Sequence, residues 1–170
     1  MATPKKIGLI GVGLMGHGIG SNIVAKGYEL GVMAHRNRKP VDDLIAKGAK
    51  EYKNPRDLTA ASDMVITVVA NSPQMEETVY RPDGILAGLH AGVVIADCTT
   101  AAPDSTAKIA ADIAAKGGRF VDTPMTRTPK EAAAGKLGLM TGGDPKTLAE
   151  IKPVLECFSD LIIHCGPVGA

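Results

Sequence analysis

The sequence is poor in aromatic residues and has almost no net charge, and both shortages narrow the range of functions. Its 170 residues include no Trp, three Tyr and two Phe, so we do not expect a surface that stacks several nucleic-acid bases on aromatic rings. Nineteen Lys and Arg balance 18 Asp and Glu, which gives a net charge of +1. A strongly basic nucleic-acid-binding protein and an acidic tail protein are therefore excluded.

Cysteine is also scarce, and long hydrophobic runs are missing. Cys98, Cys157 and Cys165 form no CxxC pair, so the sequence predicts neither a disulfide framework nor a metal site. No run reaches the roughly 18 apolar residues of a membrane-spanning helix. Glycines interrupt the apolar stretch near the N-terminus, which is unlike a signal peptide. We expect a reduced, cytoplasmic protein that has no membrane or nucleic-acid partner.

The apolar residues that are present make up 45% of the chain and form an alternation of strand-like and helix-like segments. Several strand candidates are nearly continuous apolar runs, which is typical of strands covered on both faces. The alternation predicts one domain over residues 1–170 with an α/β fold of the Rossmann type, a doubly wound and mostly parallel sheet. Expected strands are 5–12, 29–35, 64–70, 92–97, 119–123, 137–141 and 161–165, and expected helices are 14–26, 41–47, 55–61, 103–115 and 145–158.

Helix boundaries carry recognisable signals. Gly27 follows the first long helix and fits a left-handed C-cap. Pro153 lies inside the last helical segment, where we expect a kink or an early start. A capping side chain before a proline at the first helical position occurs at Asn54-Pro55, Ser72-Pro73 and Asp144-Pro145.

A glycine-rich turn with the pattern G-x-G-x-x-G separates the first expected strand from the first helix. Gly11 permits a tight turn, Gly13 lets a pyrophosphate approach the backbone, and Gly16 lets helix and strand pack closely. The free N–H groups and the helix dipole attract phosphates. The alternative is a structural turn that holds no ligand. The residues predicted to bind the diphosphate of a dinucleotide cofactor are Gly11, Val12, Gly13, Leu14, Met15 and Gly16.

The end of the second expected strand bears on which cofactor is bound. An Asp or Glu there would bond the adenosine ribose of NAD, but residues 34–39 read AHRNRK and contain no acid. Arg36, with Arg38 or Lys39 nearby, could hold a 2′-phosphate. We therefore place His35, Arg36 and Asn37 beside this ribose and favour NADP over NAD. The alternative is a solvated basic loop that has no part in cofactor choice.

Four segments resemble a known family, the β-hydroxyacid dehydrogenases, which includes 3-hydroxyisobutyrate dehydrogenase and the cofactor domain of 6-phosphogluconate dehydrogenase. The resemblance covers essentially the whole chain. It implies a nicotinamide cofactor, hydride transfer to or from a small hydroxy acid or aldehyde acid, and a homo-oligomer for the full-length form. It also implies that Val69, Ala70, Asn71 and Thr100 lie beside the nicotinamide half. The segments are IGLIGVGLMGHGIGSNIVAKG, DCTTAAPDST, FVDTPMTRTPKEAAAGKLGLMTGGD and GPVGA.

The sequence departs from the family pattern in the segment that contacts substrate. The family's S-G-G is here Thr126, Arg127 and Thr128, and Thr99 replaces the usual Ser of D-x-S-T. A guanidinium can bind a carboxylate, phosphonate or sulfonate in a bidentate manner. We hypothesise that Thr126, Arg127 and Thr128 face the substrate and that Arg127 binds its anionic end. The alternative is that Arg127 faces solvent or a neighbouring subunit.

The general acid/base is the second departure. The resemblance places a catalytic lysine on a helix after GPVGAG, which lies beyond Ala170, so we assign no catalytic residue. We expect the N-terminal part of a longer two-domain enzyme, without the helical C-terminal domain and inactive alone. A dinucleotide-binding domain without turnover and an imine reductase with another proton donor stay open as alternatives.

Overall fold

The strands form one mixed sheet whose larger part is parallel. The computed structural model describes residues 2–170. Along the sheet the order is β3-β2-β1-β4-β5-β6, and all of these neighbours pair in parallel. This arrangement confirms the predicted Rossmann-type fold. The bounds are β1 Lys6–Ile10, β2 Glu29–Val32, β3 Lys50–Glu51, β4 Met64–Thr67, β5 Val94–Asp97 and β6 Arg119–Asp122.

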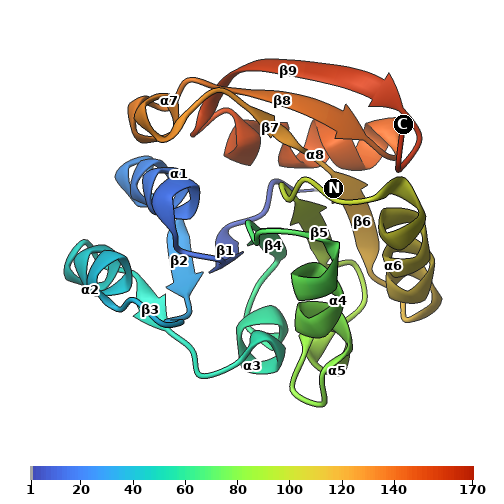
Figure 1. The fold of residues 1–170 in the computed structure, drawn as a ribbon, viewed down its shortest axis with the longest axis horizontal. Coiled ribbons are helices and arrows are strands. Elements are labelled where there is room, and N and C mark those ends of the chain that lie inside the picture. The colour runs from blue at the N-terminus through green and yellow to red at the C-terminus, as the bar shows by residue number, and fades with distance from the viewer. Residues whose placement is uncertain (1) are drawn as a thin grey trace.

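Three further strands extend the sheet beyond β6. They are β7 Met125–Thr126, β8 Leu137–Gly142 and β9 Ser159–Gly166. β8 runs antiparallel to both β6 and β7, and β9 pairs in parallel with β8. Figure 1 shows β8 and β9 together along one side of the molecule, over the last helix.

Helices cover both faces of the parallel part, which explains why the central strands β4 and β5 are buried along their whole length. One face packs against α1 Leu14–Ala25, α2 Lys39–Ala46 and α8 Pro145–Leu155 through buried residues such as Ile19, Leu44 and Ile151. The other face packs against α3 Pro55–Ala60, α4 Ser72–Tyr80, α5 Ile85–Gly88 and α6 Pro103–Ala115 (Figure 1). The remaining helix, α7 Pro129–Ala134, lies against α1.

All seven predicted strands are present; the first five are shorter than predicted and the last two are longer, and several small elements were not predicted. β1 ends at Ile10 rather than at residue 12, because Gly11 adopts φ +99 and begins the turn. β3 and β7 have two residues each, too few for a recognisable alternation. Sequence reasoning marked the start of α4 but did not list the helix, and it missed α5 and α7 altogether.

Two of the three predicted helix caps are confirmed. The side chain of Asn54 accepts a hydrogen bond from the Asp57 N–H (2.8 Å), and Asp144 caps α8 through the Thr147 N–H (2.9 Å). Ser72 is not the cap of α4, and that prediction was wrong: the preceding Asn71 accepts from the Gln74 N–H (3.1 Å). The Ser72 hydroxyl instead accepts from the Ala102 N–H at 2.8 Å.

Two single-residue predictions near helix ends have different outcomes. Gly27 has φ +88, which confirms the left-handed conformation after α1. Pro153 lies inside α8, two residues before its end at Leu155, and does not start a helix. Among residues 2–170, every helix is too short or too polar to cross a membrane.

Candidate functional site

The carboxyl ends of four neighbouring strands lie level with one another. Ile10 of β1 pairs with Thr67 of β4, Thr67 pairs with Asp97 of β5, and Asp97 pairs with Asp122 of β6. The loops that follow these strands therefore begin at the same edge of the sheet. This brings the glycine turn together with residues 68–71 and 98–100, as expected for a ligand site of a doubly wound sheet.

The glycine turn fits closely against its surroundings at two of its three glycines. A Cβ on Gly11 would overlap the carbonyl oxygen of Val68, and a Cβ on Gly16 would overlap the carbonyl oxygen of Gly11. A Cβ on Gly13 would meet no atom within 4 Å. Gly11 and Gly16 are thus needed for packing, whereas Gly13 leaves open space in front of the backbone.

The start of α1 is suited to an anion. Gly13 is its N-cap and offers no side-chain acceptor, and no acidic residue stands in the first turn. The first N–H groups of a helix have no intrahelical partner, and the dipole makes this end positive. Leu14 at the helix start is 83% exposed, and among residues 2–170 no atom lies within 4 Å of a Cβ placed on Gly13, so this end of the helix is open. A phosphate placed here would satisfy the free N–H groups.

A hollow of about 660 Å³ opens beside the glycine turn and reaches the loop that follows β2. Its size is that of a small-molecule site. It contains Val12, Gly13, Leu14 and Asn37 of the predicted cofactor residues. The lining residues are Val12, Gly13, Leu14, His17, Asn37, Lys39, Pro40, Asp43 and Lys47.

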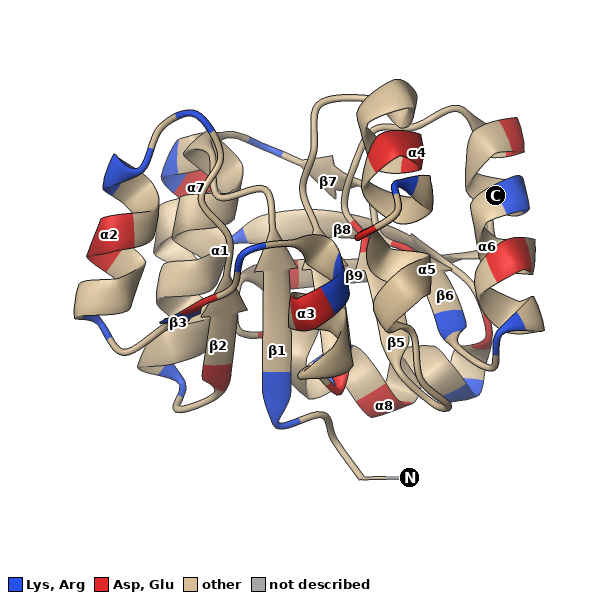
Figure 2. Cartoon of the chain, turned by 90° about the horizontal axis from the view of Figure 1, so that it is seen from below, with Lys and Arg blue, Asp and Glu red and all other residues tan. Residues whose placement is uncertain are grey.

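The basic residues after β2 are not equivalent. Figure 2 shows Lys and Arg gathered on the loop that leads into α2. Arg38 binds Glu51 (2.8 and 3.1 Å) and Asp42 (3.0 Å). Within the described residues, the Arg36 guanidinium and the Lys39 ammonium have no hydrogen-bond or ion-pair partner. Arg36 and Lys39 are therefore the cations free to receive an anion.

A neutralised carboxylate forms part of the wall of this hollow. Asp43 lies 2.6 Å from Nε2 of His17 and 2.7 Å from Nζ of Lys47. The hydrogen bonds from Lys47 and His17 hold the pKa of Asp43 below its usual range. Sequence reasoning treated His17 as structural or exposed; the four-residue spacing of Asp43 and Lys47 on α2 was the signal for part of this cluster.

A buried polar cluster lies where β4 and β5 end. Asp97 is 2% exposed and accepts hydrogen bonds from the Thr67 hydroxyl and the Thr99 N–H, both at 2.9 Å. Burial raises the pKa of Asp97. The predicted nicotinamide residues border this cluster, since the Val69 N–H donates to the Thr99 hydroxyl at 3.2 Å. Sequence reasoning did not assign Asp97, Thr67 or Thr99 to the site.

The cysteine next to this cluster is not a nucleophile. Cys98 is 1% exposed and its Sγ lies 3.1 Å from Oγ1 of Thr123. Burial raises the pKa of the Cys98 thiol to about 12. The thiol therefore stays protonated near neutral pH and acts as a small packing residue.

The predicted substrate residues follow the short strand β7. Arg127 has φ +79, a conformation that favours glycine, and this explains why the family pattern has glycine at that position. Its guanidinium donates to the carbonyl oxygen of Lys136 and to Asp160 of β9 (2.6 Å). Thr128 caps α7 and is paired with Glu131. Both of these bonds come from Nη1, and they hold Arg127 toward β9.

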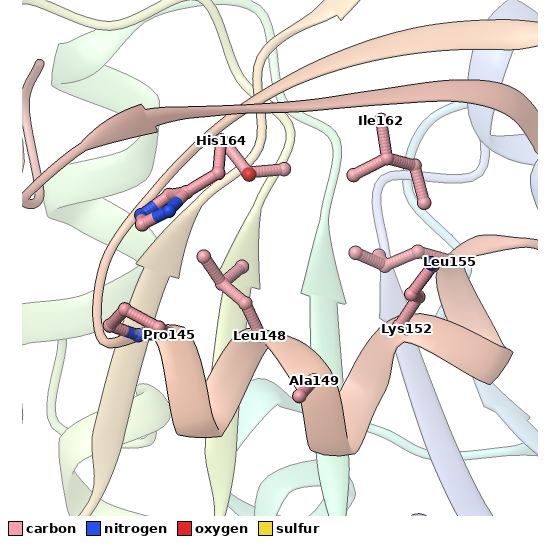
Figure 3. A pocket seen from close by; sticks show the side chains of 8 residues that line it. Pro145, Leu148, Ala149, Lys152, Leu155, Ile162 and His164 are labelled. Atoms are coloured by element: carbon pink, nitrogen blue, oxygen red, sulfur yellow. The ribbon is translucent and has the colours of Figure 1, made fainter.

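A second hollow of about 220 Å³ lies between α8 and strands β8 and β9 (Figure 3). Its lining is mostly apolar, and its two basic side chains, Lys152 and His164, lie toward opposite ends. Nε2 of His164 is already bound to the carbonyl oxygens of Gly166 (2.9 Å) and Gly143 (3.1 Å). None of the predicted site residues lies here, and no polar groups converge as in a specific ligand site.

Several proteins are similar to this chain in sequence or in fold. The NAD-dependent L-serine dehydrogenase of Pseudomonas aeruginosa is 36% identical over 166 residues, which are 98% of this chain and 55% of that protein. Mycobacterium tuberculosis 3-hydroxyisobutyrate dehydrogenase with L-serine has a TM-score of 0.87 and 28% identity, over 100% of this chain and 56% of that one. Psf3 in complex with NADP+ and 2-OPP has a TM-score of 0.89 and 30% identity, over 96% and 57%.

The chain spans little more than half the length of these proteins. The family described as the NAD binding domain of 6-phosphogluconate dehydrogenase matches residues 6–166, which include every predicted cofactor and substrate residue. The chain belongs to this family, as its resemblance to the β-hydroxyacid dehydrogenases predicts.

Proposed function

We propose that this chain binds NADP across the carboxyl edge of its sheet and that the whole protein transfers hydride between the cofactor and a small hydroxy acid or aldehyde acid. The observation that carries the proposal is the uncapped start of α1, where Gly13 leaves the backbone open beside a hollow of about 660 Å³. A nicotinamide cofactor supplies or accepts the hydride, and the protein binds and orients both reactants.

Different segments of this chain would each contact a different part of the cofactor. The diphosphate would lie on residues 11–16, and the adenosine ribose would lie beside His35, Arg36 and Asn37. The nicotinamide half would lie along the backbone of Val69, Ala70 and Asn71, next to Thr100. The four loops start at neighbouring strand ends, which supports one continuous site.

Free cations at the end of β2 favour NADP over NAD. Arg36 and Lys39 have no partner among the described residues, and no acidic residue follows β2 before α2 begins. Asp42 and Glu51 are both bound to Arg38, and Asp43 is bound to His17 and Lys47. Since the similar proteins include one named NAD-dependent and one in complex with NADP+, these local residues decide the preference.

Equilibrium titration with NADPH and NADH tests the cofactor assignment. We expect Arg36→Ala and Lys39→Ala each to weaken NADPH binding about tenfold and to leave NADH binding unchanged, because only NADPH carries the 2′-phosphate. Arg56→Ala on α3 is the matched control, since it removes an exposed Arg that pairs with Asp57 elsewhere. Tighter binding of NADH than of NADPH to the unaltered chain would contradict the preference.

The proposed substrate is a small molecule that has an anionic group next to a carbinol or aldehyde carbon. Thr126, Arg127 and Thr128 would face it, and Arg127 would exchange Asp160 for the substrate's acid group. We propose that the whole protein works as a cytoplasmic homo-oligomer, and that this chain alone binds cofactor without turnover because the family's catalytic lysine is not among its residues.

An NADPH-oxidation screen with small aldehyde acids tests the reaction. Turnover is expected from a longer form of the protein and not from the 170-residue chain, and Arg127→Ala should raise the substrate KM sharply. An unchanged KM would remove Arg127 from the substrate site and leave its bond to Asp160 as a structural tie.

A further inference from the structure

The polar cluster under the nicotinamide end contains a carboxylate that the proposed function does not use. Asp97 ends β5 and is 2% exposed. Burying a charged or polar group is costly unless hydrogen bonds satisfy it. Asp97 receives hydrogen bonds from the Thr67 hydroxyl and the Thr99 N–H, both at 2.9 Å. The surrounding groups are thus arranged to hold this one side chain.

Thr99 connects the carboxylate to the neighbouring loop. Its backbone N–H donates to Asp97 at 2.9 Å, and its hydroxyl accepts from the backbone N–H of Val69 at 3.2 Å. Thr99 thus links Val69 to Asp97 through two hydrogen bonds. Val69 lies in the segment after β4 that the proposed function places against the nicotinamide half.

A second bond ties the same two loops together at the surface. The Ala102 N–H donates to the Ser72 hydroxyl at 2.8 Å. Residues 69–71 thus lie between an inner tie at Thr99 and an outer tie at Ser72. The segment itself is only partly buried or exposed, so these ties rather than packing define its position.

We propose that Thr99, held by Asp97, is a positioning residue that fixes residues 69–71 for the nicotinamide half of the cofactor. Thr99 is 4% exposed and acts through the Val69 backbone rather than by touching the ligand. The adenosine half, bound at the glycine turn and after β2, does not depend on it. This inference rests on the proposed cofactor function.

Two ligands separate this role from a general effect on folding. NADPH carries both halves of the cofactor, whereas 2′,5′-ADP carries only the adenosine half. Thr99→Val keeps the shape and removes the hydroxyl, so it should weaken NADPH binding about tenfold and change 2′,5′-ADP binding less than about twofold. Thr99→Ser restores the hydroxyl and should bind NADPH as the unaltered chain does.

A control variant and the results that would contradict the positioning role complete this test. Thr59→Val makes the same change at a buried hydroxyl with no hydrogen-bond partner and should alter neither affinity. If Thr99→Val does not fold, Thr99→Ala repeats the test. Unchanged NADPH binding, or an equal loss for both ligands, overturns the positioning role. If the unaltered chain binds neither ligand, the proposed cofactor function fails and this inference falls with it.

Discussion

The side-chain amide of Asn22 on α1 donates to the carbonyl oxygen of Ala132 on α7 at 2.9 Å. The same nitrogen lies 3.2 Å from the carbonyl oxygen of Ala133, near the end of α7 where carbonyls lack helical partners. Gly18 makes the approach possible, because a Cβ there would lie 2.7 Å from the α7 backbone. The helix that starts at the cofactor turn thereby holds the helix that follows the substrate loop.

Asn22→Leu is expected to lower the free energy of unfolding by about 1–3 kcal/mol, because the carbonyl oxygens of α7 lose their donor in a partly buried place. Urea denaturation measures this loss. The matched control is Asn37→Leu, whose side chain bonds only the neighbouring Lys39 N–H at the surface. Equal stabilities of the two variants would show that the tie between α1 and α7 contributes nothing.

Gly16→Ala and Gly13→Ala should differ in stability although both lie in the same turn. The Gly16 variant forces a methyl group against the Gly11 carbonyl and should lose about 1–3 kcal/mol of unfolding free energy. The Gly13 variant should melt as the unaltered chain does, since its methyl group meets nothing. Thermal unfolding of both variants measures this difference. A large loss of stability in the Gly13 variant would contradict the expectation.

Thr59→Val should stabilise the chain by about 1 kcal/mol. The Thr59 hydroxyl is fully buried and has no hydrogen-bond partner among residues 2–170, so the native state leaves a polar group unsatisfied that the unfolded chain exposes to water. Valine has nearly the same shape and removes the polar atom. Chemical denaturation should show a higher midpoint with the same slope; a lower midpoint would contradict this reasoning.

Asp97→Asn should change the pH dependence of stability. Burial raises the pKa of Asp97 in the folded chain above its value in the unfolded chain, so ionisation opposes folding as pH rises from the ordinary carboxyl range through the raised value. Below about pH 3 the group is protonated in both states and this penalty is absent. The stability of the Asn variant relative to the unaltered chain should therefore be more favourable at about pH 7 than at about pH 3. A relative stability that is equal at the two pH values would contradict the raised pKa.

The sequence sufficed for the longer strands of the parallel part, though not for the two-residue β3, because the signals of the longer strands are local. Apolar runs, the glycine turn and residues such as Asn54 and Asp144 mark where β1, α3 and α8 lie. The pairing of β7, β8 and β9 could not be predicted from the sequence. Met125 and Thr126 form only two ladder positions, and no short-range pattern encodes their antiparallel partner.

The candidate site was predictable where residue type alone determines the chemistry. The glycines of residues 11–16 and the cations after β2 belong to that class. The bond of Arg127 to Asp160, 33 residues away, and the Thr99–Asp97–Thr67 cluster depend on tertiary proximity. Gly18 also looked like an ordinary helical residue until the backbone of α7 was placed against it.

Titration of the chain with NADPH, compared with Gly13→Val, tests the central claim most directly. A branched side chain at Gly13 would stand over the N–H groups at the start of α1, without contact to the rest of the fold at its Cβ. We predict saturable 1:1 binding by the unaltered chain and a loss of at least about tenfold in the folded variant. Equal NADPH affinity of both proteins, or no binding by the unaltered chain, would contradict a dinucleotide site at this turn.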